Sequence, residues 1–152
     1  MAEKGISYAS LLQNIKKGKI DPCYLFHGEE LFLAEQLSDA IIFKIFNAEK
    51  DDFNLHLFYG KESTGENVLN AAMSFPVMAE KKVVVLRDTE QLDKNSRDAL
   101  VQYFNNPLDS TCFIAITSKP DFRQKLFTTL KEKAVCVELK RLRENDVPAW
   151  IE

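Results

Sequence analysis

The sequence has no uninterrupted apolar run of about 18 to 20 residues, the length that a membrane-spanning helix needs. Its first residues, Met1-Ala2-Glu3-Lys4-Gly5, lack the apolar core of a secretory signal. These absences predict a cytoplasmic protein that makes no contact with a membrane.

Cysteine is scarce, and the three cysteines, Cys23, Cys112 and Cys136, lie far apart. Zinc sites and redox pairs usually place two cysteines within a few residues of each other, so this spacing predicts neither. Each cysteine stands in a short apolar run that is typical of a buried strand. We interpret all three as small core residues and expect no metal site and no cofactor.

Glycine and proline are few, at five each in 152 residues, and the net charge is only -3. This composition excludes fibrous and low-complexity chains, and it is unlike the strongly basic domains that coat nucleic acid. The chain instead has 45% hydrophobic residues, among them eleven phenylalanines. That content is sufficient for the core of one globular domain of this length.

Patterns that suit helices alternate with patterns that suit strands along the chain. A first amphipathic helix begins near Tyr8 and ends before Gly18. Strands are then predicted at 23–27, 53–59, 83–86, 112–116 and 135–139, with helices at about 30–46, 64–73, 93–104 and 122–130. This order predicts an α/β fold with a five-stranded, mainly parallel sheet and helices on both faces.

Two local details of the prediction concern the second strand and the helix after it. Apolar and polar residues alternate in 53–59, which indicates a half-solvated strand near the sheet edge, with Asn54 and His56 on the solvated side. Ser63 and Glu66 have the spacing of a capping box that opens the following helix.

The loop after the first strand is where a sheet of this kind would bind a nucleotide. A phosphate-binding loop has the pattern G-x-x-x-x-G-K-[ST], because backbone amides surround the phosphate and the lysine neutralises it. Here Gly28 is followed by Glu29 and Glu30, without that lysine. Two carboxylates would repel a triphosphate, so the sequence predicts a P-loop-like domain with a degenerate nucleotide site.

Other candidate catalytic groups are weak. Arg87 follows the third predicted strand and precedes Asp88 and Glu90, which disfavours a magnesium site at that strand end. We interpret His27 as a structural loop residue and His56 as a solvent-side strand residue, because no nucleophile elbow or paired metal ligand accompanies them. No residue is assigned a catalytic role.

The segment Phe75-Pro76-Val77-Met78 places four apolar residues in a connection that should lie on the surface. It either packs beneath the sheet or forms an exposed tip that binds a pocket of a partner protein.

Basic clusters form a separate feature. They stand at 16–19, 81–82, 131–133 and 140–143, and interleaved acids favour solvated faces over phosphate contacts for all of them.

Three segments in this order, Tyr24 to Leu33, Phe75 to Val85, and Asn106-Pro107 before the strand 111–117, resemble the N-terminal region of the delta-subunit family of bacterial DNA polymerase III, the clamp loader. The resemblance implies an AAA+-like clamp-binding domain over residues 1–140 that has lost nucleotide binding. It implies that residues 141–152 are the truncated start of a helical lid domain.

The resemblance also assigns a role to the apolar segment. Val77 and Met78, with Phe75 and Pro76 beside them, match the family positions that insert into a hydrophobic cleft of the sliding clamp, the beta subunit, and help to open its ring during DNA replication. The family implies contacts with other clamp-loader subunits through C-terminal domains that this sequence does not include. We expect any DNA contact by this part to be weak.

Because the P-loop lysine is missing, we predict that this chain is not an enzyme. The resemblance implies that full-length members belong to the DNA polymerase III holoenzyme, a DNA-directed DNA polymerase. The alternative is an active P-loop ATPase or nucleotide-binding enzyme of similar topology, which the missing lysine disfavours. A phosphoacceptor receiver-like domain ranks lower, because it would need an acidic residue where Arg87 stands.

Overall fold

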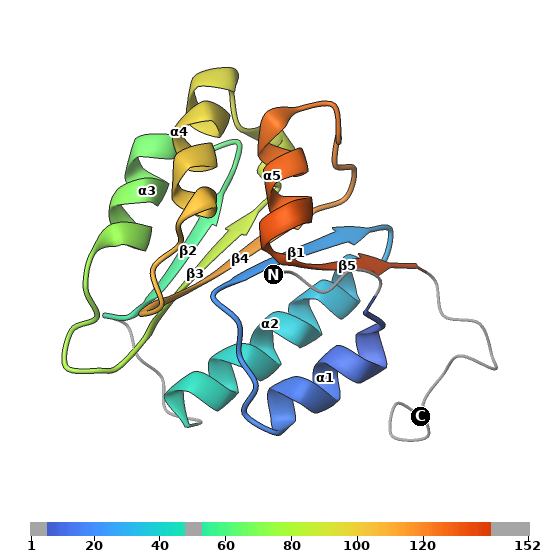
Figure 1. The fold of residues 1–152 in the computed structure, drawn as a ribbon, viewed down its shortest axis with the longest axis vertical. Coiled ribbons are helices and arrows are strands. Elements are labelled where there is room, and N and C mark those ends of the chain that lie inside the picture. The colour runs from blue at the N-terminus through green and yellow to red at the C-terminus, as the bar shows by residue number, and fades with distance from the viewer. Residues whose placement is uncertain (1–5, 48–52, 141–152) are drawn as a thin grey trace.

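The computed structural model describes residues 6–47 and 53–140, in which helices and strands alternate around a five-stranded sheet (Figure 1). In chain order the elements are α1 (Tyr8–Lys16), β1 (Cys23–Gly28), α2 (Leu31–Phe46), β2 (Leu55–Tyr59), α3 (Gly65–Met73), β3 (Lys82–Arg87), the 3-10 helix η1 (Thr89–Gln91), α4 (Lys94–Asn105), β4 (Thr111–Thr117), α5 (Lys125–Lys133) and β5 (Val135–Leu139).

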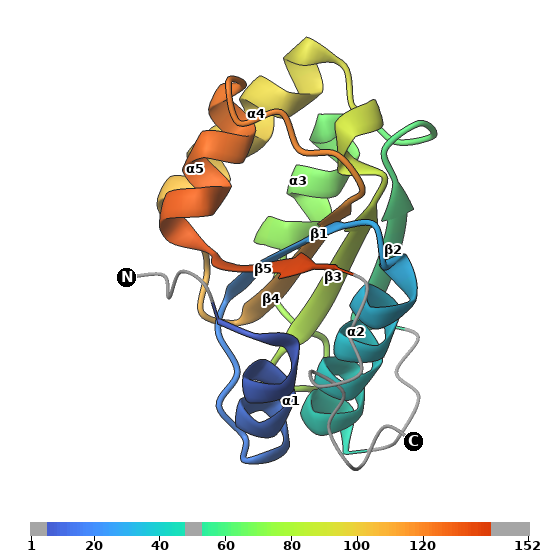
Figure 2. The ribbon, with the colours of Figure 1, turned by 90° about the vertical axis from the view of Figure 1, so that its right-hand side faces the viewer.

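The strands are ordered β2-β3-β4-β1-β5, and every neighbouring pair is parallel. Figure 2 shows helices on both sides of the sheet, with α1 and α2 on one face and α3, α4 and α5 on the other. The predicted α/β class and parallel sheet are therefore confirmed. The strand order explains why residues of β1, β3 and β4, which lie inside the sheet, are more buried than residues of β2 and β5, which form its edges.

Side chains of alternate strand residues form two cores, one on each face. Tyr24 and Phe26 of β1 point toward α1 and α2, while Cys23 and Leu25 point toward the other three helices. Cys23 and Cys112 are buried, as predicted, and Cys136 is half-buried. Burial raises the pKa of the Cys23 thiol to about 12, so it stays a neutral core group at physiological pH.

The alternation of buried and solvated residues predicted for 53–59, which include β2, is only partly confirmed. This strand is at the sheet edge, as expected, but Asn54 just before it is buried, with 1% of its surface exposed, so its predicted solvated position is wrong. His56 is half-buried, and burial followed by the charge of Lys82 lowers its pKa. The apolar Leu57 is instead 52% exposed.

The start of α3 also differs from the prediction. The residue before the helix is Thr64, whose hydroxyl accepts a hydrogen bond from the backbone N–H of Asn67. The cap is therefore Thr64 rather than Ser63, one residue further along the chain. Asp93 caps α4 in the same way through the N–H of Ser96.

The expected lid-domain start, residues 141–152, lies outside the described residues. The division into two domains therefore stays a prediction. Within 6–47 and 53–140, no helix is long and apolar enough to cross a membrane.

Candidate functional site

The loop after β1 is held by backbone contacts with β5. Gly28 has φ +125°, and a Cβ at this position would lie 2.4 Å from the carbonyl oxygen of Leu139. The N–H of Glu30 donates to that same carbonyl at 3.2 Å, and the N–H of Leu31 donates to the carbonyl of Glu29 at 3.2 Å. These amides are therefore occupied within the chain, in a loop where a phosphate cradle would direct its amides at the ligand.

At the carboxyl end of β3, the side chain of Arg87 forms an ion pair with Glu35. The Arg87 guanidinium donates to both carboxylate oxygens of Glu35 on α2, with distances of 2.7 and 2.6 Å. It also lies 5.6 Å from the ring centre of Tyr59. The hydrogen bond to Glu35 raises the pKa of Arg87 further, so the group that occupies this strand end is a permanent positive charge.

The other polar side chains considered as catalytic or metal-binding groups do not form one cluster. The Thr117 hydroxyl donates to Glu90 at 2.5 Å, while Asp88 is exposed at a left-handed position with φ +52°. Within the described residues no three or more His, Cys, Asp or Glu side chains form a group that could hold a metal ion. His27 is the penultimate residue of β1 rather than a loop residue, and its ring packs edge-on against Phe122 at 5.6 Å.

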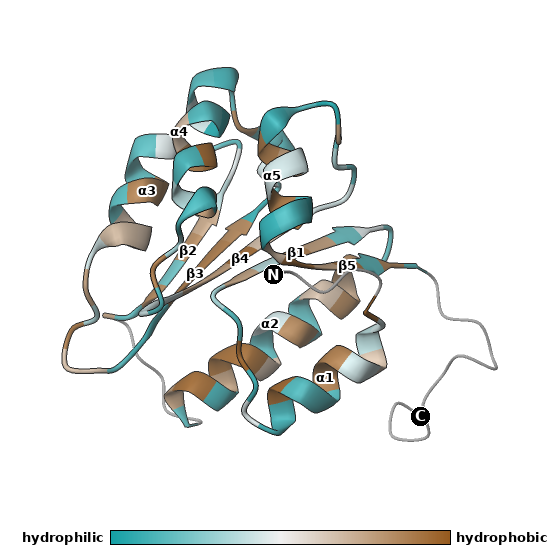
Figure 3. Cartoon of the chain, in the orientation of Figure 1, coloured by the Kyte–Doolittle hydropathy of each residue, from teal (hydrophilic) through white to brown (hydrophobic). Residues whose placement is uncertain are grey.

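The segment Phe75–Met78, which we call the tip, follows α3 and bends away from the sheet. Phe75 is 81% exposed, Val77 52% and Met78 102%, while Pro76 is half-buried. In Figure 3 the connection between α3 and β3 is brown at its outer bend. The exposure rules out the alternative in which these side chains pack beneath the sheet.

Two buried polar side chains support the tip, although the sequence predicts solvated positions for both. The amide of Asn54 contacts the backbone of Val77 twice, accepting from its N–H at 2.7 Å and donating to its C=O at 2.8 Å. The Lys82 ammonium donates to the carbonyl of Ala71 at 2.9 Å and to the hydroxyl of Ser74. Lys82 is 2% exposed, so the predicted solvated basic pair at 81–82 is wrong for this residue.

No signal in the sequence distinguishes these two residues from ordinary strand-flanking polar groups. Asn54 lies 23 positions from Val77, and only the pairing of β2 with β3 brings them together. Lys82 opens an apolar run, a position where a lysine is usually solvated.

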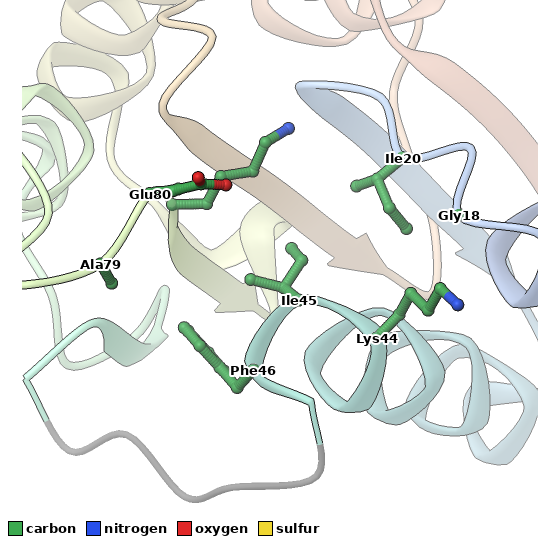
Figure 4. Close-up of a pocket in the computed structure, with 8 residues that line it drawn as sticks. Gly18, Ile20, Lys44, Ile45, Phe46, Ala79 and Glu80 are labelled. Carbon is green, nitrogen blue, oxygen red and sulfur yellow. The ribbon is translucent and has the colours of Figure 1, made fainter.

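A cavity of about 360 Å³ lies beside the residues that follow the tip. In Figure 4, Ile45 and Phe46 from the end of α2 and Ile20 from the segment before β1 provide apolar walls, and Ala79 and Glu80 close another side. Because every strand is parallel, these segments meet at the amino end of the sheet, opposite the Gly28 loop.

Comparison with known proteins gives a family match over most of the chain. The family model described as "DNA polymerase III, delta subunit" matches residues 24–140. The DNA polymerase III subunit delta of Bacillus subtilis (strain 168) is 28% identical over 145 residues, which are 88% of this chain and 42% of that protein.

Solved structures give the same result. The Bacillus subtilis DNA clamp loader delta protein aligns with a TM-score of 0.81 and 28% identity, over 89% of this chain and 43% of that one. A DNA polymerase III gamma subunit-related protein from Thermotoga maritima aligns at 0.66 with 15% identity, over 91% and 47% of the two chains, and supports the fold alone. The chain spans about two-fifths of the length of its Bacillus relatives.

Proposed function

The chain belongs to the DNA polymerase III delta-subunit family, and from this premise we propose that it binds the sliding clamp, the beta subunit, through its tip. The observation that carries the proposal is the exposure of Phe75, Val77 and Met78 on one short connection outside both cores. The family resemblance assigns a hydrophobic cleft of the clamp as the binding surface for these positions.

The tip has the chemistry that such a cleft requires. Burying an exposed apolar side chain stabilises a complex by about 1.5 to 3 kcal/mol. Met78 has an unbranched side chain that adapts to an irregular cleft, and Pro76 restricts the backbone beside it. If the tip binds an opened clamp more tightly than a closed one, the difference in affinity shifts the ring toward opening.

We propose further that the Gly28 loop binds no nucleotide, so that this chain is not an ATPase and needs no cofactor. Three features support this: Leu139 occupies the space beside Gly28, the loop amides bond to carbonyls of the chain, and only Glu29 and Glu30 separate β1 from α2. ATP would then act in partner subunits of the loader.

The rest of the proposal follows the family. Residues 141–152 begin a helical lid domain, further domains join this chain to the other clamp-loader subunits, and the assembly acts in the cytoplasm during DNA replication. The relatives are more than twice as long as the part that matches, which leaves room for such domains.

The experiment compares the affinity of this chain and of its Val77→Ala/Met78→Ala variant for the purified beta clamp by calorimetry. Two truncations at about 1.5 kcal/mol each predict a loss of affinity of roughly a hundredfold. Because both side chains are exposed, the free energy of unfolding should stay within about 0.5 kcal/mol of the parent value.

The matched control is Phe32→Ala/Phe43→Ala, which truncates two exposed phenylalanines on α2, at 68% and 63% exposure. This variant should bind the clamp as the parent does. Unchanged affinity of the tip variant, or an equal loss in both variants, would contradict the proposal.

A further inference from the structure

We propose that Asn54 is a positioning residue that holds the tip in its clamp-binding conformation before the clamp arrives. The inference rests on the proposed function, since it concerns the affinity of that same surface. It adds a buried residue outside the tip to those that determine binding.

The backbone of Asn54 is itself fixed by the sheet. Its carbonyl accepts a hydrogen bond from the N–H of Val83 at 2.8 Å, directly before β2 pairs with β3. The residue is 1% exposed, so its side chain is held among neighbours with little freedom to rotate. The side-chain amide of Asn54 is therefore held in a fixed position relative to the sheet.

The side-chain amide matches the peptide groups of Val77. Its Oδ1 accepts from the Val77 N–H at 2.7 Å, and its Nδ2 donates to the Val77 C=O at 2.8 Å. Of the side chains of this length, only asparagine offers both a donor and an acceptor on one planar group. The contact fixes the backbone of Val77 while its side chain remains 52% exposed.

The tip needs this support because it has no regular secondary structure of its own. Phe75 and Met78 are almost entirely exposed, and Met78 has φ +55°, a region that residues other than glycine rarely adopt. Such a backbone persists only when its surroundings determine it. A tip that sampled many conformations would have to be ordered on binding, and the ordering would reduce its affinity.

Lys82 supports the tip from its other side. The ammonium group binds the Ala71 carbonyl and the Ser74 hydroxyl at the end of α3, where a cation also complements the helix dipole. Burial lowers the pKa of Lys82, which reflects how far the group is removed from water. Ser74 and Val77, on the two sides of Phe75 and Pro76, are therefore both tied to buried residues.

The test combines clamp affinity with amide hydrogen exchange in the parent chain, Asn54→Leu and Asn54→Asp. Leucine fills the site but removes both hydrogen bonds, whereas aspartate keeps an acceptor for the Val77 N–H. We expect Asn54→Leu to bind the clamp about tenfold more weakly and to lose protection of the Val77 amide, while amides of β3 and β4 stay protected. Asn54→Asp should retain protection at Val77 and lie between the two in affinity.

Val137→Ala is the matched control, because it truncates a buried residue of β5 at the opposite edge of the sheet. It should lower stability without changing clamp affinity or Val77 exchange, which separates positioning from a general loss of stability. If Asn54→Leu does not fold, Asn54→Asp decides. The inference is overturned if the Val77 amide of Asn54→Asp loses its protection from exchange while this variant binds the clamp as tightly as the parent.

The outcomes separate the two proposals. Rapid Val77 exchange in the parent, or Asn54→Leu affinity within twofold of the parent, overturns the role of Asn54 and leaves clamp binding intact. Failure of the parent to bind the clamp, or unchanged binding by Val77→Ala/Met78→Ala, overturns the proposed function and this inference with it.

Discussion

Two glycines with positive φ show how differently single residues of the same kind are constrained. Gly28, at φ +125°, lies against the backbone of Leu139, where a Cβ has no space. Gly18, at φ +91°, has only the flexible Lys44 side chain nearby, 3.6 Å from the position of a Cβ. The conformation excludes most residues at both sites, but steric exclusion by backbone atoms acts only at Gly28.

We predict that Gly28→Ala lowers the free energy of unfolding by about 2 kcal/mol or more, because strain in φ is added to a backbone collision. Gly18→Ala should cost only about 1 kcal/mol, the price of the left-handed conformation alone. Urea denaturation of both variants measures the difference. Equal losses would mean that Leu139 does not approach Gly28 closely.

The two residues that support the tip from outside it show where prediction from sequence failed at this scale. The exposed residues themselves were identified from their apolar character and the family resemblance, whereas Asn54 and Lys82 were assigned to solvated positions. Polar side chains are usually exposed, so burial of these two could be recognised only from their hydrogen-bond partners.

At the scale of elements, α3 connects the edge strand to the tip, and its first turn is fixed by a single side chain. Thr64 accepts from the N–H of Asn67, whereas Ser63, the sequence-based candidate, lies one residue outside the cap. Only Ser63 has the glutamate of a capping box, Glu66, three residues further on, whereas Asn67 stands three residues after Thr64. Thr64 caps the helix with its hydroxyl alone, which the capping-box pattern does not predict. The extended backbone of Thr64, with φ -101° and ψ 151°, identifies it as the cap.

Thr64→Ala should therefore lower the free energy of unfolding by about 1 kcal/mol, because the N–H of Asn67 loses its acceptor. Ser63→Ala, the adjacent control, should change it by less than about 0.5 kcal/mol. Thermal denaturation followed by circular dichroism compares the two variants. A larger effect at Ser63 would return the cap to the position predicted from the sequence.

At the scale of the whole molecule, the parallel sheet separates two regions. The Gly28 loop and the Arg87–Glu35 pair lie where strands end, while the tip and the cavity beside it lie where strands begin. A nucleotide at the first region and a clamp at the second would therefore lie at opposite ends of the strands. Contacts within the chain occupy the loop amides and Arg87 at the first region, and the exposed tip lies at the second.

We predict that ATP with magnesium leaves the melting temperature of this chain unchanged, whereas the beta clamp stabilises it. A ligand at a hundred times its dissociation constant would add about 2.7 kcal/mol to the free energy of unfolding, which a thermal-shift measurement detects readily. Inorganic triphosphate with magnesium controls for nonspecific ionic effects. Saturable stabilisation by ATP alone would favour the nucleotide-binding alternative.

The sequence by itself determined the order of helices and strands, the edge position of the strand at 53–59, the family resemblance and the residues of the tip. These features depend on periodic patterns and short motifs within a few neighbouring residues. Only the tertiary structure decided the strand order, the burial of Asn54 and Lys82, and the exposure of the tip. Those features depend on contacts such as the one between Asn54 and Val77, 23 residues apart, which exist only after β2 and β3 have paired.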